Sequence, residues 1–103
     1  MNIQEKNRLQ ENGWQVGSAQ DFLGLTDAEM AYIDLRLSLA RRLREQRREN
    51  NLTQVQVARL IHSNQSRVAK MEAGDASVSL DLLIRSLLVL GITKDDLAQV
   101  ISG

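Results

Sequence analysis

Residues 53–74 read TQVQVARLIHSNQSRVAKMEAG, and this stretch decides the fold. It opens with the form of a capping box, in which the side chains of Thr53 and Gln56 bond each other's backbone N–H groups and start a helix. The apolar residues that follow recur at the spacing of one helix face and are Val57, Ala58 and Ile61. We therefore expect a short helix of about nine residues with one buried face.

A turn and a second short helix complete the stretch. The turn comprises residues 62–64, and the side-chain oxygen of Asn64 can cap the helix that follows. We expect that helix over residues 65–73, and Gly74 to end it because glycine adopts the left-handed conformation after a helix. Its inward-facing residues are Val68 and Met71.

A long helix is expected before this pair. Residues 26–29 (Thr-Asp-Ala-Glu) again have capping-box form, and the helix could extend to about Arg48. Asn50 and Asn51 then end it, since asparagine tolerates the left-handed conformation. One apolar stripe recurs at three- and four-residue steps and comprises Met30, Ile33, Leu37, Ala40 and Leu43.

A helix rich in leucine is expected after Gly74. Ser79 caps it, its sequence over residues 80–90 is LDLLIRSLLVL, and Gly91 ends it. The residues expected to face the core are Leu80, Leu83, Ile84, Leu87 and Leu90. Leu82, Leu88 and Val89 fall on its other faces. A helix that is apolar nearly all round must be covered on more than one side.

A last short helix begins after Thr93, and its apolar side comprises Leu97, Val100 and Ile101. Because the chain has no proline and only six glycines, helices joined by short turns are expected throughout. The predicted fold class is therefore all-α. A five-helix domain with a lengthened first helix occupies residues 26–103, and residues 1–25 form an N-terminal extension.

Composition excludes several classes of function. The chain has no cysteine, which rules out disulfides, thiolate metal sites and cysteine nucleophiles and fits a cytoplasmic location. No apolar run reaches the roughly 20 residues of a membrane helix, and the N-terminus lacks the apolar stretch of a signal peptide. With His62 as the single histidine, and without a Gly-rich phosphate loop or a Ser/His/Asp set, we expect no metal, no cofactor and no enzyme.

The charges are unevenly distributed although the net charge is zero. Residues 36–72 carry nine basic and three acidic side chains, whereas residues 1–35 carry two and six, and residues 73–103 two and four. Such a run can be a solvated helix face. A concentrated positive region can equally attract phosphates, even in a neutral protein.

The helix over residues 65–73 carries side chains suited to DNA. A second helix of this kind can lie in the major groove with its N-terminal side chains at base edges. Glutamine can bond adenine in two places, arginine or lysine can bond guanine, and a small residue leaves room for a thymine methyl group. The expected base-reading residues are Gln65, Ser66, Arg67 and Lys70. The expected phosphate-binding residues, near the start of the preceding helix and beside it, are Arg44, Thr53, Gln54 and Asn64.

A longer series of residues carries a family resemblance: Leu39, Leu43, Arg44, Arg47, Asn51-Leu52-Thr53-Gln54, Val57-Ala58, Ile61, Gln65-Ser66, Val68, Met71-Glu72, Gly74, Leu90-Gly91-Ile92 and Asp96-Leu97. With them, residues 39–101 resemble the phage-repressor and Cro-like helix-turn-helix domain, often called the XRE family, which has the five-helix lambda-repressor-like fold. The resemblance implies a transcriptional regulator, specifically a repressor, that binds double-stranded DNA with the 65–73 helix in the major groove. It also implies a partly buried ion pair between Arg47 and Glu72.

Two positions depart from the usual pattern of this family. His62 stands where glycine is common, and Ser63 stands where an apolar residue is common. Glycine suits a positive φ after a helix, and histidine adopts that conformation at some cost. We expect His62 to be a turn residue or a neighbour of phosphate.

A second resemblance concerns residues 13–17, 22–26 and 74–83, which are similar to small stand-alone regulators and to the antitoxins of host-inhibition-of-growth modules. It implies a cytoplasmic prokaryotic regulator that is dimeric and able to bind a toxin. The alternative function is therefore an antitoxin that acts mainly as a protein-interaction module and neutralises a small toxin. Trp14 and Phe22 either anchor the extension on the helical body, as large rings usually do, or form a partner surface.

A homodimer is expected on physical grounds. The domain is small, and the helix over residues 80–90 and the last helix expose more apolar surface than one copy covers. In a dimer, two recognition helices about 34 Å apart would read a palindrome.

Overall fold

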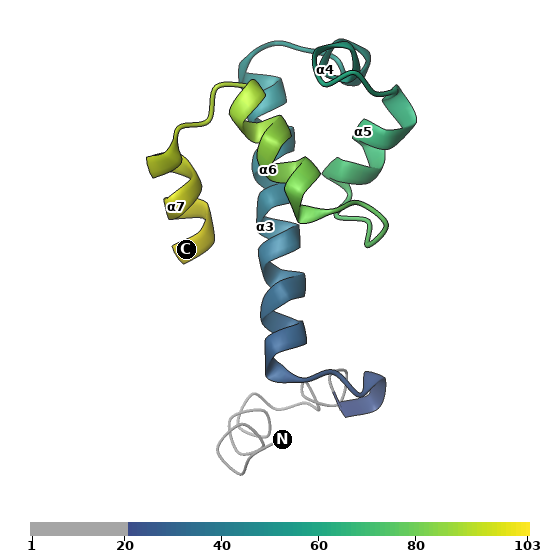
Figure 1. The fold of residues 1–103 in the computed structure, drawn as a ribbon, viewed down its shortest axis with the longest axis vertical. Helices are drawn as coiled ribbons and strands as arrows, with labels where there is room; N and C mark the ends of the chain where they lie inside the picture. Colours follow the sequence, from purple (N-terminus) through teal and green to yellow (C-terminus); the bar gives the residue numbers. More distant parts are fainter. Residues whose placement is uncertain (1–20) are drawn as a thin grey trace. The chain divides into compact units, whose positions relative to one another are not determined.

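The structure, a computed structural model, describes residues 21–103. These residues form helices and turns and no strand, which confirms the predicted all-α class. Five complete helices, α3 to α7, correspond to the five expected (Figure 1). Packing divides the chain after Asp34 into two compact units, and the second runs from Leu35 to Gly103. The domain boundary expected after residue 25 stays a prediction.

The lengthened first helix is α3 (Asp27–Glu49). Its capping box forms as predicted: the Thr26 N–H donates to Glu29 Oε1 at 3.2 Å, and the Glu29 N–H donates to Thr26 Oγ1 at 3.1 Å. Its end also follows the prediction, because Asn51 takes a left-handed backbone with φ 58°. α3 therefore begins and ends where short-range backbone chemistry sets it.

The buried face of α3 differs from the predicted stripe. Ala40 and Leu43 are buried as expected, but Leu37 is 42 % exposed and Leu39 is fully buried instead. Arg36, one of the nine basic residues counted over residues 36–72, is also buried. Since each helical residue turns by about 100°, the face through 36, 39, 40 and 43 lies well to one side of Leu37. The predicted stripe thus has the right period and is confirmed at Ala40 and Leu43, but the buried face is rotated away from Leu37 toward Arg36 and Leu39.

The central pair of helices is α4 (Gln54–Leu60) and α5 (Gln65–Glu72). The capping box of Thr53 and the cap of Asn64 both form, the latter through a 2.8 Å bond from the Arg67 N–H to Asn64 Oδ1. Both helices are one or two residues shorter than expected. Between them His62 takes φ 57°, the left-handed conformation expected at this position.

The remaining helices are α6 (Leu80–Val89) and α7 (Lys94–Ser102), capped by Ser79 and Thr93. The side chains of Gln46, in α3, and of Asn50, directly after it, donate their amide hydrogens to the Leu90 carbonyl, each at 3.0 Å. That carbonyl follows the last turn of α6, where intrahelical donors have run out. These bonds hold the end of α6 beside the end of α3.

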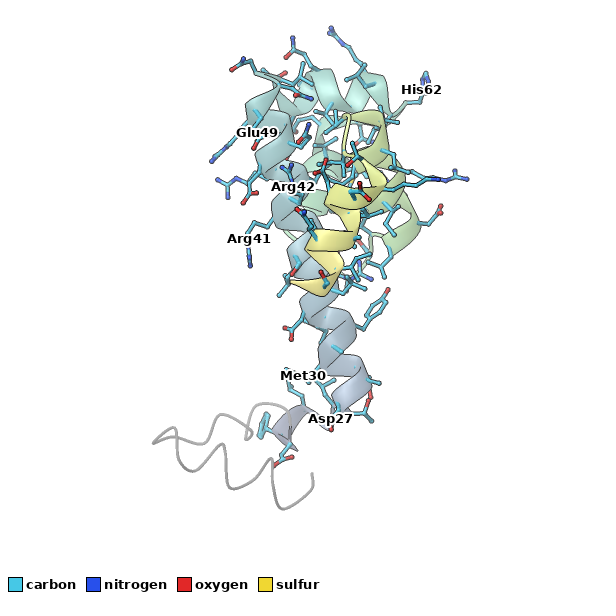
Figure 2. All side chains as sticks on the ribbon, turned by 90° about the vertical axis from the view of Figure 1, so that its left-hand side faces the viewer. Asp27, Met30, Arg41, Arg42, Glu49 and His62 are labelled. Atoms are coloured by element: carbon cyan, nitrogen blue, oxygen red, sulfur yellow. The ribbon has the colours of Figure 1, made fainter. Side chains whose placement is uncertain are left out.

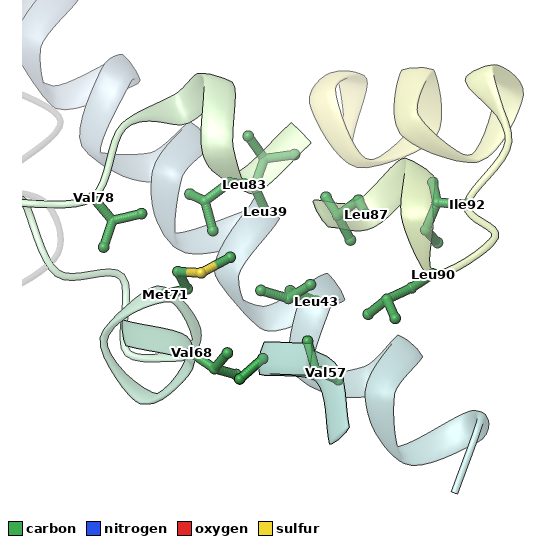
Figure 3. Close-up of a cluster of buried hydrophobic side chains, with 11 residues drawn as sticks. Leu39, Leu43, Val57, Val68, Met71, Val78, Leu83, Leu87, Leu90 and Ile92 are labelled. Atoms are coloured by element: carbon green, nitrogen blue, oxygen red, sulfur yellow. The ribbon is translucent and has the colours of Figure 1, made fainter. Parts of the chain in front are cut away.

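The core lies where α3, α4, α5 and α6 meet (Figure 3). The members labelled in the close-up are Leu39, Leu43, Val57, Val68, Met71, Val78, Leu83, Leu87, Leu90 and Ile92. Burial of each side chain of this kind stabilises the fold by roughly 1.5–3 kcal/mol. The apolar backs of α4 and α5 belong to this core, which is what holds the pair in a fixed orientation. Among residues 21–103, no helix combines the length and apolarity needed to cross a membrane.

Candidate nucleic-acid interface

The four residues expected to read bases share one exposed face of α5. Gln65, Ser66, Arg67 and Lys70 are all exposed. On the opposite side of the helix Val68 and Met71 are fully buried in the core. A helix of eight residues with this division presents its polar side chains from a rigid support.

Gln65 is joined to the first helix of the pair by a hydrogen bond. Its Nε2 donates to Gln54 Oε1 at 2.7 Å, and Gln54 Nε2 donates to Glu72 Oε1 at 3.2 Å. The Gln54 side chain therefore bridges the beginning and the end of α5. The sequence placed Gln54 beside phosphate and did not foresee this bridge, because a side-chain pair eleven residues apart leaves no periodic signal.

Glu72 also forms an ion pair with Arg47 of α3. Arg47 Nε lies 2.5 Å from Glu72 Oε2 and Nη2 lies 3.0 Å from Oε1, so the contact has two points. The hydrogen bond with Glu72 raises the pKa of Arg47 above its ordinary value. Arg47 Nη1 further donates to the Leu52 carbonyl at 3.0 Å. Arg47 thus ties α3 to α5 and to the connection that leads into α4.

A groove borders α5 on the side of Arg67 and Lys70. We call it the Lys70 groove; it measures about 430 Å³ and is lined by Asn64, Ser66, Arg67, Lys70, Ser77 and Val78. Arg67 and Lys70 supply two positive charges on one wall. Ser77 and Val78 form the other wall and belong to the connection between α5 and α6. Ser77 was not foreseen as a site residue, since only the tertiary fold brings it beside α5.

A second groove borders a different face of the same helix. This Arg44 groove measures about 370 Å³ and is lined by Arg44, Arg47, Arg48, Gln54, Ala69, Glu72 and Ala73. Because Arg47 is paired with Glu72, the positive charge in this groove comes from Arg44 and Arg48. Both residues are exposed. Arg48 was counted in the basic run but not singled out as a site residue.

The other residues expected near phosphate lie at the two helix starts. Thr53 is engaged in its capping box: Oγ1 accepts from the Gln56 N–H at 3.1 Å, and the Thr53 N–H donates to Gln56 Oε1 at 2.8 Å. Asn64 uses Oδ1 as a cap, and the residue lines the Lys70 groove. His62 projects outward from the turn between the helices (Figure 2). Thr53 thus stands at the start of α4, and His62 and Asn64 directly precede α5.

Comparison with known proteins gives one family match. The model of a family described as "Helix-turn-helix domain" matches residues 38–100. This range agrees closely with residues 39–101, for which the sequence resemblance was argued, and it includes both grooves and the core behind them. No curated protein and no solved structure matches the chain.

Proposed function

The chain belongs to the helix-turn-helix domain family, and from this premise we propose that it is a sequence-specific regulator of transcription, acting as a repressor on double-stranded DNA. The family is typically non-enzymatic. The observation that carries the proposal is the exposed face of α5, where Gln65, Ser66, Arg67 and Lys70 stand on a helix whose back is fixed in the core. Such a protein acts in the cytoplasm, where prokaryotic DNA lies.

In this proposal α5 enters the major groove and its side chains read bases. Gln65 suits adenine, because a carboxamide can donate and accept at one base edge. Its bond to Gln54 orients the carboxamide before DNA arrives, which reduces the side-chain entropy lost on binding. Arg67 and Lys70 suit guanine, and Ser66 leaves room for a thymine methyl group.

The two grooves beside α5 then receive the phosphate backbones that border the major groove. Arg44 and Gln54 act in the Arg44 groove, and Asn64 acts in the Lys70 groove. Thr53 acts through the start of α4, which its capping box holds in place. Phosphate contacts of this kind fix the register of a protein on DNA but do not read the sequence.

We further propose that the protein acts as a homodimer. Leu88, Val89 and Ile101 on α6 and α7 are each about half exposed, although they are large and apolar. A second copy would cover them, and two α5 helices would then read a palindromic site with half-sites about 34 Å apart. Sedimentation at micromolar concentration should show a dimer; a monomer alone would contradict this part of the proposal.

The decisive experiment selects a binding site from random duplexes and measures affinity as salt rises. Arg67→Ala should weaken binding to the selected site, and affinity should fall steeply with salt because phosphate contacts release counterions. The matched control is Arg85→Ala. Arg85 is also an exposed arginine, but it lies on α6 and pairs with Asp81 at 3.4 Å. Equal affinities of both variants, or no enrichment of any site, would contradict the proposal.

The alternative role, neutralising a small toxin protein, has one observation in its favour. Within the N-terminal unit, a shallow apolar hollow of about 290 Å³ is lined by Leu25, Ala28, Glu29, Tyr32 and Ile33. Phe22 is 88 % exposed in the same unit. Trp14, the other aromatic residue considered for a partner surface, lies outside the described residues. Co-expression with the product of the neighbouring gene tests this role: a stable complex lost in Phe22→Ala would support it, and no complex would contradict it.

A further inference from the structure

Arg36 is a charged residue in the interior of the domain. Only 7 % of its surface is exposed, on the same face of α3 as Leu39, Ala40 and Leu43. Its Nη1 donates to two carbonyl oxygens in the connection between α5 and α6: that of Asp75 at 3.1 Å and that of Val78. Burial removes Arg36 from direct contact with a ligand, and these two bonds let it act on binding through the segment that it holds.

That segment, residues 75–78, is a tight turn, which we call the 75–78 loop. The Asp75 N–H donates to the Lys70 carbonyl at 3.0 Å, and the Val78 N–H donates to the Asp75 carbonyl at 3.1 Å. Ser77 N–H donates to Asp75 Oδ1 at 2.8 Å. Val78 is buried in the core. The loop is thus closed on itself and anchored from beneath by the guanidinium of Arg36.

The 75–78 loop forms one wall of the Lys70 groove. Ser77 and Val78 line that wall, and Arg67 and Lys70 line the opposite one. The width of the groove therefore depends on where the loop lies relative to α5. Hydrogen bonds from an ionised donor are shorter and stronger than neutral ones, so Arg36 restrains the loop more firmly than its backbone turn alone.

We propose that Arg36 is a positioning residue for DNA binding, which holds the 75–78 loop at the distance from α5 at which Ser77 contacts the phosphate backbone beside the bases that Lys70 reads. The inference rests on the proposed function and adds two residues to it. Ser77 supplies a neutral hydroxyl, which donates to the Asp75 carboxylate in the free protein and turns to phosphate on binding, and Arg36 supplies no contact of its own. Because Arg36 neutralises no phosphate, it should affect affinity without affecting the number of counterions released.

The test measures affinity for a mixed-sequence duplex of about 30 base pairs over a range of salt concentrations. Arg36→Met keeps the length of the side chain and removes both hydrogen bonds. It should weaken binding about tenfold and leave the slope of log affinity against log salt unchanged. Arg44→Ala removes a charged phosphate contact and is the reference for direct binding; it should lower the magnitude of that slope by about 0.9.

A double-mutant cycle identifies the route of the effect. Ser77→Ala should weaken binding about three- to tenfold in the unchanged protein and have little effect in the Arg36→Met background, because the loop is already displaced there. Gln65→Ala should be additive with Arg36→Met. If Arg36→Met melts below the assay temperature, Arg36→Lys replaces it; it keeps a charged donor, so its loss of affinity should be smaller, again with an unchanged slope.

Each result has one reading. No binding of the unchanged protein to any duplex would overturn the proposed function and the inference with it. Binding that is unaffected by Arg36→Met, a slope that falls as in Arg44→Ala, or full additivity of Arg36→Met with Ser77→Ala would overturn the inference alone. Weaker binding at an unchanged slope, with coupling to Ser77, would support it.

Discussion

The side chain of Leu37 lies directly over Gly74. A Cβ atom at position 74 would come within 2.7 Å of Leu37 Cδ2, and Gly74 has φ 71°, a conformation that L residues rarely adopt. Leu37 therefore packs against Gly74, although it is not part of the buried core. This contact also places α3 close to the point where α5 ends.

We expect Gly74→Ala to lower the free energy of unfolding by about 1–2 kcal/mol, mainly through the left-handed backbone. The clash adds little, because the exposed end of Leu37 can rotate away. Gly91→Ala is the matched control: its φ is 97°, yet the nearest atom to the added Cβ is Gln46 Nε2 at 3.9 Å. Denaturant titration should give similar losses for both variants. A far larger loss at position 74 would show that Leu37 is held rigidly.

The ion pair between Arg47 and Glu72 yields a second prediction. The Glu72 side chain is only 5 % exposed, so Glu72→Ala leaves the Arg47 guanidinium largely buried without its carboxylate. Removing one partner of such a pair costs about 3–5 kcal/mol. Arg47→Met combined with Glu72→Leu removes both charges and should be more stable than Glu72→Ala by urea denaturation. Equal stabilities would mean that the charges contribute little.

Acid should destabilise the domain through two carboxylates at helix starts and turns. The backbone hydrogen bond from Thr93 is the main cause that lowers the pKa of Asp96, and the hydrogen bonds from Ser77 lower the pKa of Asp75. A lowered folded-state pKa stabilises the fold above the ordinary value of 3.8, and this contribution is lost as pH falls through the folded-state pKa.

The free energy of unfolding, measured from neutral pH to below the folded-state pKa of Asp96, should therefore stay constant near neutral pH and fall only at the acid end. In Asp96→Asn the loss on acidification should be smaller, because residue 96 no longer binds a proton. Asp95→Asn, which leaves the capping box intact, is the control. The prediction fails if carbon-13 NMR titration gives the Asp96 carboxyl group a pKa at or above its ordinary value.

The turn between α4 and α5 predicts a stabilising change. His62 takes φ 57°, where glycine is free of steric conflict. His62→Gly should raise the free energy of unfolding by about 1 kcal/mol. Asn51→Gly is the comparison, since Asn51 has φ 58° and asparagine tolerates that region, so its gain should be smaller. A loss of stability in His62→Gly would indicate that the imidazole makes a contact that stabilises the fold.

The sequence predicts those parts of this fold that depend on neighbours in the chain. The caps of Thr26, Thr53, Asn64, Ser79 and Thr93 form because each requires only a side chain three residues from a backbone N–H. The phase of α3 was harder to predict, since Leu37 and Leu39 fit the same period and the choice depends on which face meets α6.

The candidate site likewise has features that its local sequence predicts and features that only the tertiary fold determines. The exposed face of α5 follows from its own sequence, as does its buried back. The bridge through Gln54, the buried place of Arg36 and the position of Ser77 all require contacts between residues far apart in the chain. A charge count cannot reveal that Arg36 donates to two carbonyl oxygens, because the sequence does not distinguish a solvent-exposed arginine from one that is buried against a loop.

The bridge from Gln65 through Gln54 to Glu72 has a consequence for how binding preference can change. A new side chain at position 65 would leave Gln54 with an unmatched oxygen beside the DNA and would release its hold on the end of α5. Retargeting this protein, whether by selection in nature or by engineering, would therefore proceed through paired substitutions at positions 54 and 65. Libraries that vary position 65 alone should yield mostly weak binders, whereas libraries that vary both positions should yield variants with new preferences.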